Sequence, residues 1–232
     1  MLSSRTIIAS ILRVQEKRKV FHTVFARRFS SNEEDEWHNR DKRLPKLMNL
    51  PIRPYPKLKL MLRNFIFSNV IIGPYYDKNF SRNNFTEGAK IAVEFVSNAI
   101  ATGDFDTLRE SKSVTEDCLR EVILNFSTFS IAQQQLLAFS KKDLIYNFIY
   151  EIGVMLDSEK DTRHVEITYT AHYLPHLESL AERAESYADI KEATTKGTGP
   201  IILTYRFIRN YTKGVEDSWT INGLNHACLK EL

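Results

Sequence analysis

The hydrophobic pattern of this chain changes period part-way along its length. Between residues 82 and 101 the apolar side chains recur at helical spacing on one face, and shorter helical stretches follow as far as Phe139. From Leu144 the period becomes two, and alternate positions are apolar as far as Leu156. Helices followed by a run of strands predict an α+β domain, in which N-terminal helices pack on a curved antiparallel β-meander.

Local signals place the ends of these elements. Ser81 can cap the 82–101 helix, Phe80 and Phe85 can form a hydrophobic staple across that cap, and Gly103 can end the helix. The tetrapeptide Ser113-Val-Thr-Glu116 has the form of a capping box that opens the helix ending near Phe126. Residues 157–163 suit a hairpin loop, and further strands are predicted over 165–173, from 201 to about 207, and from 219 to about 228.

The apolar face of the predicted strands is rich in aromatic groups. The simpler interpretation is that these rings form the core of the domain. The alternative is that they line a concave pocket for an apolar peptide or an acyl chain. The residues of this possible client pocket are Tyr146, Phe148, Tyr150, Tyr169, Tyr205 and Phe207.

Residues 57–72 predict an amphipathic helix that begins after Pro56 and stops at Gly73-Pro74. Its longest stretch without charge, residues 64–76, is too short to span a membrane, which takes about 20 mostly apolar residues. Apolar groups on most sides favour two interpretations: the helix lies on an anionic membrane or a partner protein, or it packs on its own domain. The candidate membrane or partner contacts are Lys57, Lys59, Leu62, Arg63, Phe65 and Ile66.

The net charge of +3 is unevenly distributed. Residues 1–29 contain seven basic side chains and one acidic side chain, which leaves 25 basic and 28 acidic residues in the rest of the chain. An arginine-rich, acid-poor segment with interspersed isoleucines is typical of a mitochondrial transit peptide. Arg27 precedes Ser30 by three residues, so we expect cleavage between Phe29 and Ser30. The alternative is a basic N-terminus with no targeting function.

Residues 30–56 are polar at first and then contain Pro45, Pro51, Pro54 and Pro56. Proline removes amide donors and fixes φ, so no helix or strand is expected there. We therefore predict three regions: a transit peptide over 1–29, a disordered linker over 30–56, and one domain over 57–232 that includes the 57–72 helix.

The sequence contains no motif for catalysis, a cofactor or a metal ion. Two cysteines are too few for a disulfide framework or a cysteine-based zinc site. The histidines at 164, 172, 176 and 226 lack metal-ligand spacing, and His172 falls on the polar face of its strand, where a solvated side chain is expected. The acidic balance outside the leader argues against nucleic-acid binding. An acid–base pair assembled only by the fold stays open, because sequence motifs do not report it.

Two segments resemble the family of matrix proteins that interact with the m-AAA protease of the mitochondrial inner membrane. They are residues 76–92 (YDKNFSRNNFTEGAKIA) and residues 205–221 (YRFIRNYTKGVEDSWTI). The resemblance runs from about Leu58 to the C-terminus and is weakest between Ser127 and Gly199. That family is similar in turn to the C-terminal domain of the import-motor membrane anchor and to the membrane-bound mitoribosome receptor, which share an NTF2-like cone.

The resemblance implies a non-enzymatic adaptor or chaperone in the matrix, peripherally associated with the inner membrane. Its implied partners are m-AAA protease subunits and newly imported inner-membrane proteins, including the small regulatory subunit of the calcium uniporter. Two alternatives remain. One is a receptor associated with the mitoribosome or the import motor, and the other is an enzyme that uses an NTF2-like pocket.

Overall fold

A computed structural model describes residues 43–157, 162–178, 180 and 199–232 of the 232-residue chain. The predicted transit peptide, with its cleavage between Phe29 and Ser30, and residues 30–42 of the predicted linker lie outside the described residues.

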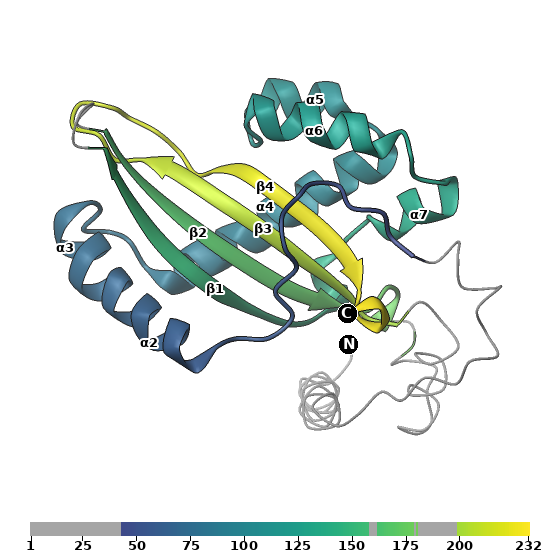
Figure 1. Cartoon of the computed structure of the whole chain (residues 1–232), viewed down its shortest axis with the longest axis horizontal. Coiled ribbons are helices and arrows are strands. Elements are labelled where there is room, and N and C mark those ends of the chain that lie inside the picture. The colour runs from purple at the N-terminus through teal and green to yellow at the C-terminus, as the bar shows by residue number, and fades with distance from the viewer. Residues whose placement is uncertain (1–42, 158–161, 179, 181–198) are drawn as a thin grey trace, which may run out of the picture.

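The described elements follow one another as helices first and strands second (Figure 1). The helical elements are α2 (Leu58–Ile66), the π-helical η3 (Phe67–Ile72), α3 (Gly73–Tyr75), α4 (Arg82–Thr102), α5 (Phe105–Ser111), α6 (Glu116–Phe126), α7 (Ile131–Leu136), η4 (Lys141–Asp143) and, at the end of the chain, η5 (Leu229–Glu231). The strands are β1 (Leu144–Asp157), β2 (Thr162–Tyr173), β3 (Ile201–Asn210) and β4 (Thr220–Cys228).

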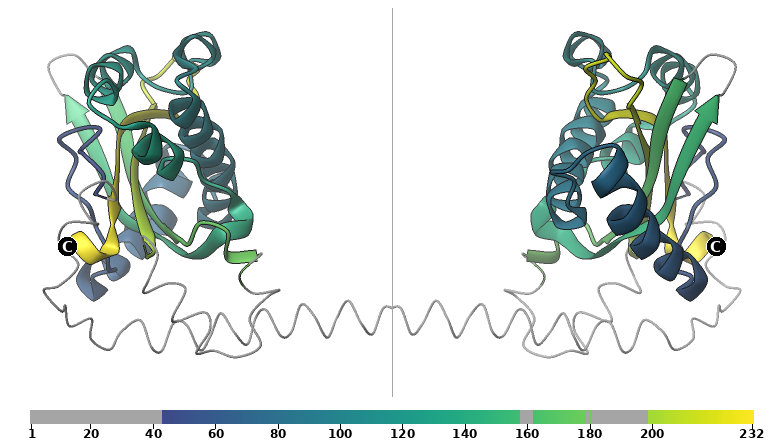
Figure 2. Two further views of the ribbon diagram at one scale, coloured as in Figure 1. Left: turned by 90° about the vertical axis from the view of Figure 1, so that its right-hand side faces the viewer. Right: turned by 90° about the vertical axis from the view of Figure 1, so that its left-hand side faces the viewer.

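The four strands form an open antiparallel meander in the order β1-β2-β3-β4. The long helix α4 crosses one face of this sheet, and residues 43–56 cross the opposite face, as the side views show (Figure 2). The predicted α+β class, with helices packed on a curved antiparallel meander, is therefore confirmed.

Sequence signals placed α4 and β2 correctly. The Asn84 amide donates to Ser81 Oγ at 3.5 Å, the rings of Phe80 and Phe85 lie 6.4 Å apart between centroids, and Gly103 adopts a left-handed φ of 71°. The predicted inner face of β2 is fully buried: Val165, Ile167, Tyr169, Ala171 and Tyr173. These residues pack against the apolar side of α4, which makes this face of the sheet the core of the domain.

The uninterrupted alternation predicted along β1 is wrong. Its register against β2 shifts twice, between Leu144 and Tyr146 and between Ile149 and Glu151. A bulge inserts one residue, and because side chains alternate with a period of two, it moves the following residues to the other face. Consequently Ile149 and Ile152 both lie in the core, although the sequence pattern puts them on opposite faces.

The capping box predicted at Ser113-Val-Thr-Glu116 is also wrong. Helix α6 begins at Glu116 after Thr115, whose side chain makes no capping hydrogen bond. Ser113 and Thr115 instead bond to β4, because the Ile221 amide donates to Ser113 O at 2.9 Å and the Thr115 amide donates to Ile221 O at 2.8 Å. Because Thr115 is the N-cap, Ser113 lies two residues before it and Glu116 is the first helical residue, so neither occupies the position that a capping box requires. The capping box that forms joins Ser130 and Gln133 at the start of α7.

Residues 43–56 are ordered, which corrects the prediction of a disordered linker for this part; we call them the strap. They form no helix or strand, as the prolines predict. Leu47 is nevertheless fully buried, its amide donates to Asn225 Oδ1 at 3.1 Å, and the Arg53 amide donates to Thr204 Oγ1 at 3.2 Å. Side chains of β3, β4 and α6 bond to backbone groups of the strap, which forms no strand pairing of its own.

The strap also overturns the prediction that His172 is solvated. His172 is only 5% exposed, and its Nε2 lies 2.8 Å from the carbonyl oxygen of Pro54. The rings of Tyr55, Tyr146 and Phe148 surround the imidazole, with centroids 6.2–6.5 Å away. The face of β2 that looks polar in sequence is therefore covered by a segment from the N-terminal side of the domain.

Candidate functional site

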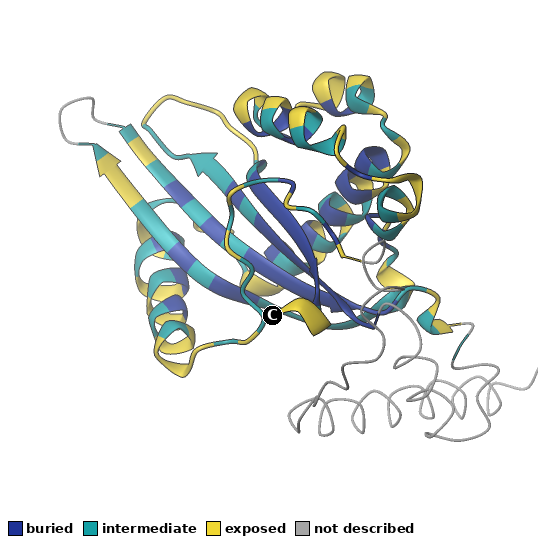
Figure 3. Ribbon diagram, turned by 45° about the vertical axis from the view of Figure 1, so that its right-hand side comes forward, coloured by how far each residue is buried: buried dark blue, intermediate teal, exposed yellow. Residues whose placement is uncertain are grey.

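Helix α2 and the π-helical η3 that continues it turn their polar side toward the sheet and their apolar side away from it. Asn64 and Ser68 are buried, whereas six apolar residues are between 45% and 83% exposed (Figure 3). We call these six the outward stripe: Leu58, Met61, Leu62, Phe65, Ile66 and Val70. Their spacing of three and four residues puts them along one side of the helix. Surface helices normally bury such a stripe against the core.

The polar side of α2 is used to complete the edge of β1. Asn64 Nδ2 donates to the carbonyl oxygens of Ile149 at 3.2 Å and Tyr150 at 3.0 Å, and the Ile152 amide donates to Asn64 Oδ1 at 2.9 Å. These backbone groups flank the second bulge of β1. Because one side of the helix must satisfy them, the apolar residues are left on the opposite side.

The six predicted contact residues of this helix separate into two groups. Leu62, Phe65 and Ile66 belong to the outward stripe, and Lys57 and Lys59 are exposed at its N-terminal end. Arg63 points the other way: it forms an ion pair with Glu151 and donates to Ile152 O at 3.3 Å. Its guanidinium also lies 5.5 Å from the ring centroid of Phe67. Arg63 thus anchors the helix to β1.

The helical run is longer than predicted, because α3 extends it past Gly73-Pro74 to Tyr75. Pro74 lies in the first turn of α3, where a helix has no need of that amide. Even with this extension, none of the described helices has the length and apolar character needed to cross a membrane.

The six residues of the predicted client pocket do not line one cavity. Tyr146 and Phe148 lie on the strap side of the sheet beside His172, and Tyr150 lies there under the guanidinium of Arg53, 5.1 Å from its ring centroid. The other three belong to the buried core on the α4 side: Tyr169, Tyr205 and Phe207. The two bulges of β1 separate the groups, and the core interpretation holds for the second group.

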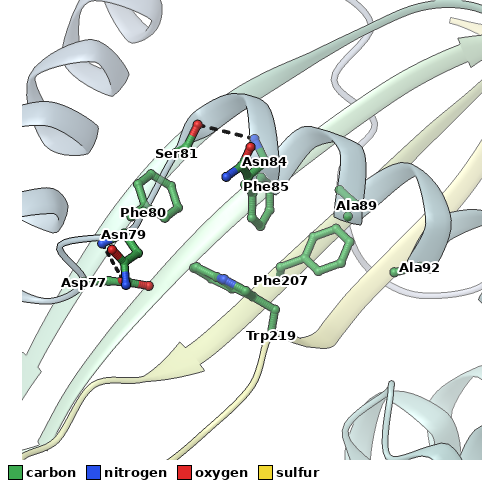
Figure 4. Close-up of a pocket in the computed structure, with 11 residues that line it drawn as sticks. Asp77, Asn79, Phe80, Ser81, Asn84, Phe85, Ala89, Ala92, Phe207 and Trp219 are labelled. Carbon is green, nitrogen blue, oxygen red and sulfur yellow. Dashed lines mark hydrogen bonds between the residues drawn. The ribbon is translucent and has the colours of Figure 1, made fainter.

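A cleft of about 340 Å³ lies where the start of α4 faces Phe207 of β3 and Trp219, which directly precedes β4 (Figure 4). Four aromatic rings form much of its wall: Phe80, Phe85, Phe207 and Trp219. The Phe85 ring meets those of Trp219 and Phe207 edge to face, with centroids 5.1 and 5.4 Å away. Small residues of α4, namely Gly88, Ala89 and Ala92, line the cleft next to these rings.

The polar lining of the cleft is almost uncharged. It consists of Asp77, Asn79, Ser81 and Asn84, of which only Asp77 has an ionisable side chain. Arg209 Nη1 lies 3.1 Å from Asp77 Oδ2 and balances its charge. Within the described ranges, no three His, Cys, Asp or Glu side chains converge as metal ligands would. The geometry therefore fits binding of an apolar group better than acid–base chemistry.

Of the cleft residues, sequence reasoning had singled out Phe207 as a pocket candidate and Phe80 and Phe85 as a helix staple. For Trp219 the sequence predicts only a place at the start of the last strand. The sequence feature that indicates the cleft is Gly88, because a glycine inside a strongly periodic helix usually has a packing or functional role.

His226 belongs to a buried polar network that lies outside the cleft. Tyr205 Oη lies 2.8 Å from Ser97 Oγ and 2.9 Å from His226 Nε2, and all three residues are buried. Burial lowers the pKa of His226 from 6.5 to about 3. The imidazole is thus neutral at physiological pH, and these three groups connect α4 to β3 and β4 inside the core.

We expect the stability of the protein to fall between pH 7 and pH 5 because of His226. The unfolded chain binds a proton near pH 6.5, whereas the folded imidazole stays neutral down to about pH 3. The contribution of neutral His226 to the free energy of unfolding is therefore fully present above pH 6.5 and is lost as the pH falls from 6.5 toward 3. At pH 5 the loss is about 2 kcal/mol. Urea unfolding at the two pH values measures it. His226→Gln should show a smaller decrease, and equal decreases in both proteins would contradict the assignment.

No protein-family model matches the chain. Proteins named "m-AAA protease-interacting protein 1, mitochondrial" match it in Rattus norvegicus and Mus musculus, each with 29% identity over 165 residues. The chain is therefore similar in sequence to the m-AAA protease-interacting proteins. The Homo sapiens protein of the same name is 26% identical over 209 residues, or 88% of this chain. The match covers 56% of the length of the two rodent proteins and 68% of the human protein.

Proposed function

We propose that this protein is a non-enzymatic adaptor of the mitochondrial matrix that associates with the m-AAA protease at the inner membrane. It would assist the sorting and maturation of newly imported inner-membrane proteins, such as the small regulatory subunit of the calcium uniporter. The proposal depends on the outward stripe of α2, which presents apolar area that a folded partner would bury. The names of the relatives, which state a mitochondrial protein that interacts with this protease, support it.

The charges beside the outward stripe favour a position at a membrane surface. Lys57 and Lys59 are exposed where α2 begins, and the first turn of the helix contains no acidic residue. Basic residues next to an apolar helical face are attracted to anionic lipid headgroups. A peripheral location would bring the stripe close to a membrane-bound protease.

An enzyme is a weaker candidate, because the cleft offers no acid–base pair. General acid–base catalysis requires a titratable group within hydrogen-bond reach of the substrate. Asp77 is held by Arg209, and His226 is buried away from the cleft. The arrangement supports binding rather than turnover.

The test is affinity purification of the tagged full-length chain from mitochondria, scored by mass spectrometry for m-AAA protease subunits. The informative variant is Leu62→Glu/Phe65→Glu, which puts two charges into the outward stripe. Both positions are more than half exposed, so the fold should tolerate the change. We expect recovery of the protease to fall at least about tenfold, since burying an unpaired carboxylate in an apolar contact is costly.

The matched control is Leu124→Glu/Ile131→Glu. It adds the same charges at apolar residues that are 72% and 76% exposed but lie outside α2. Recovery should match wild type in this control. Normal recovery with the α2 variant would exclude the stripe as the contact. Failure of the wild-type chain to enrich the protease would refute the proposed function itself.

A further inference from the structure

Gly88 is an unusual residue for its place in α4. It lies inside a helix of 21 residues, where glycine costs about 1 kcal/mol relative to alanine. Its backbone is not in the left-handed region, and a Cβ at this position would meet no atom within 4 Å. Neither conformation nor close packing therefore requires glycine here. Gly88 lines the cleft on the same side of α4 as Phe85 and Ala92, so the missing side chain keeps the cleft open.

The rim of the cleft is suited to a peptide backbone. The side-chain carboxamides of Asn79 and Asn84 are exposed, and neither forms a hydrogen bond to any described part of the protein. A carboxamide both donates and accepts, as the amide and carbonyl of a peptide do. The ion pair of Asp77 with Arg209 leaves no free charge on the lining. A carboxylate or phosphate headgroup would find no counter-charge among these residues, whereas a neutral peptide segment needs none.

We propose that the cleft binds an uncharged, extended peptide segment by taking in one large apolar side chain, preferably an aromatic one. The four rings of the wall supply edge-to-face contacts for that side chain, and Asn79 and Asn84 bond to the backbone on either side of it. The volume of about 340 Å³ lies at the lower end of the usual range for binding pockets, which suits one side chain better than a whole ligand. This inference goes beyond the proposed function and needs no contact with the protease.

The test is an NMR titration of the ¹⁵N-labelled full-length chain, followed at the Gly88 amide and the Trp219 indole N–H. The probes are the acetylated, amidated peptides Gly-Ser-Phe-Ser-Gly and Gly-Ser-Ala-Ser-Gly, and decanoate as an acyl chain. We expect the phenylalanine peptide to shift both signals and to bind at least about tenfold more tightly than the alanine peptide, because only its ring fills the cleft.

Two variants address the cleft directly. Gly88→Leu fills it and should abolish the shift of the Trp219 indole. Gly88→Ala is the conservative variant: it should unfold at a higher temperature than wild type, since alanine favours the helix, and yet bind the peptide roughly threefold more weakly. The Leu62→Glu/Phe65→Glu variant should bind the peptide as wild type does, which separates this site from the protease contact on α2.

Three outcomes would overturn the inference: equal binding of the two peptides, unchanged binding by Gly88→Leu, or shifts produced by decanoate and not by the phenylalanine peptide. The last would make the cleft an acyl-chain site. None of them would affect the recovery of the protease with the wild-type chain, so the two proposals fail independently.

Discussion

Replacing Leu47 by alanine is expected to lower the free energy of unfolding by about 3 kcal/mol. Leu47 is fully buried in the strap, and its backbone is fixed by Asn225 on one side and by Asn125, whose Nδ2 donates to Leu47 O at 2.9 Å, on the other. The surrounding chain is held on two elements and cannot collapse into the space left by the side chain, so most of the lost packing remains as a cavity.

Chemical denaturation of the full-length protein measures this effect. Lys46→Ala is the matched control, because Lys46 is exposed and adjacent in the strap; its effect should stay within about 0.5 kcal/mol. If the strap were only a linker, the two substitutions would have the same small effect. That result would mean that residues 43–56 are not part of the folded unit.

The second large effect is expected for Asn64→Leu, which should destabilise the protein by roughly 3 kcal/mol or more. The substitution nearly conserves volume, so it creates little cavity, but it removes the partners of three backbone groups of β1. Those backbone groups lie beneath α2, and a buried amide or carbonyl without a hydrogen-bond partner destabilises the folded state. The amide of Ile152 should also exchange with solvent faster, because it loses its acceptor.

Asn69→Leu provides the comparison for this prediction. Asn69 is exposed on the same helical run, and its side chain bonds only to Phe65 O within that run, at 2.9 Å. We expect a change within about 0.5 kcal/mol. Equal destabilisation by the two substitutions would show that Asn64 does not hold α2 to the sheet.

The sequence predicts well those elements in which apolar residues recur at a single constant spacing. β2 is such a case, since its five apolar residues point into the core without interruption. β1 is the opposite case. The positions of its bulges depend on which residues of β2 and α2 lie opposite, so the sequence of β1 alone does not predict them. The order of the strap is not predicted either, for a similar reason. Its prolines correctly exclude regular structure, but the burial of Leu47 depends on Asn225, far away in sequence.

The candidate sites show the same limit. Sequence identified α2 as a helix with apolar groups on many sides, but the direction of those groups follows from Asn64, whose partners belong to β1. The cleft could not be predicted as a unit, since Phe80 and Phe85 flank the N-cap of α4. Phe207 comes from β3, and Trp219 directly precedes β4. Only the tertiary fold brings these rings together.

The covered positions at both margins of the sheet limit strand pairing with other polypeptides. Midway along β1, the side chain of Asn64 in α2 bonds to backbone groups at the edge. At the other margin, backbone groups of Ser113 and Thr115 bond to the backbone of Ile221 in β4. An open margin would let an incoming polypeptide add itself as another strand, and such growth ends in aggregates. At these positions the sheet therefore offers no free backbone groups to which another polypeptide could pair.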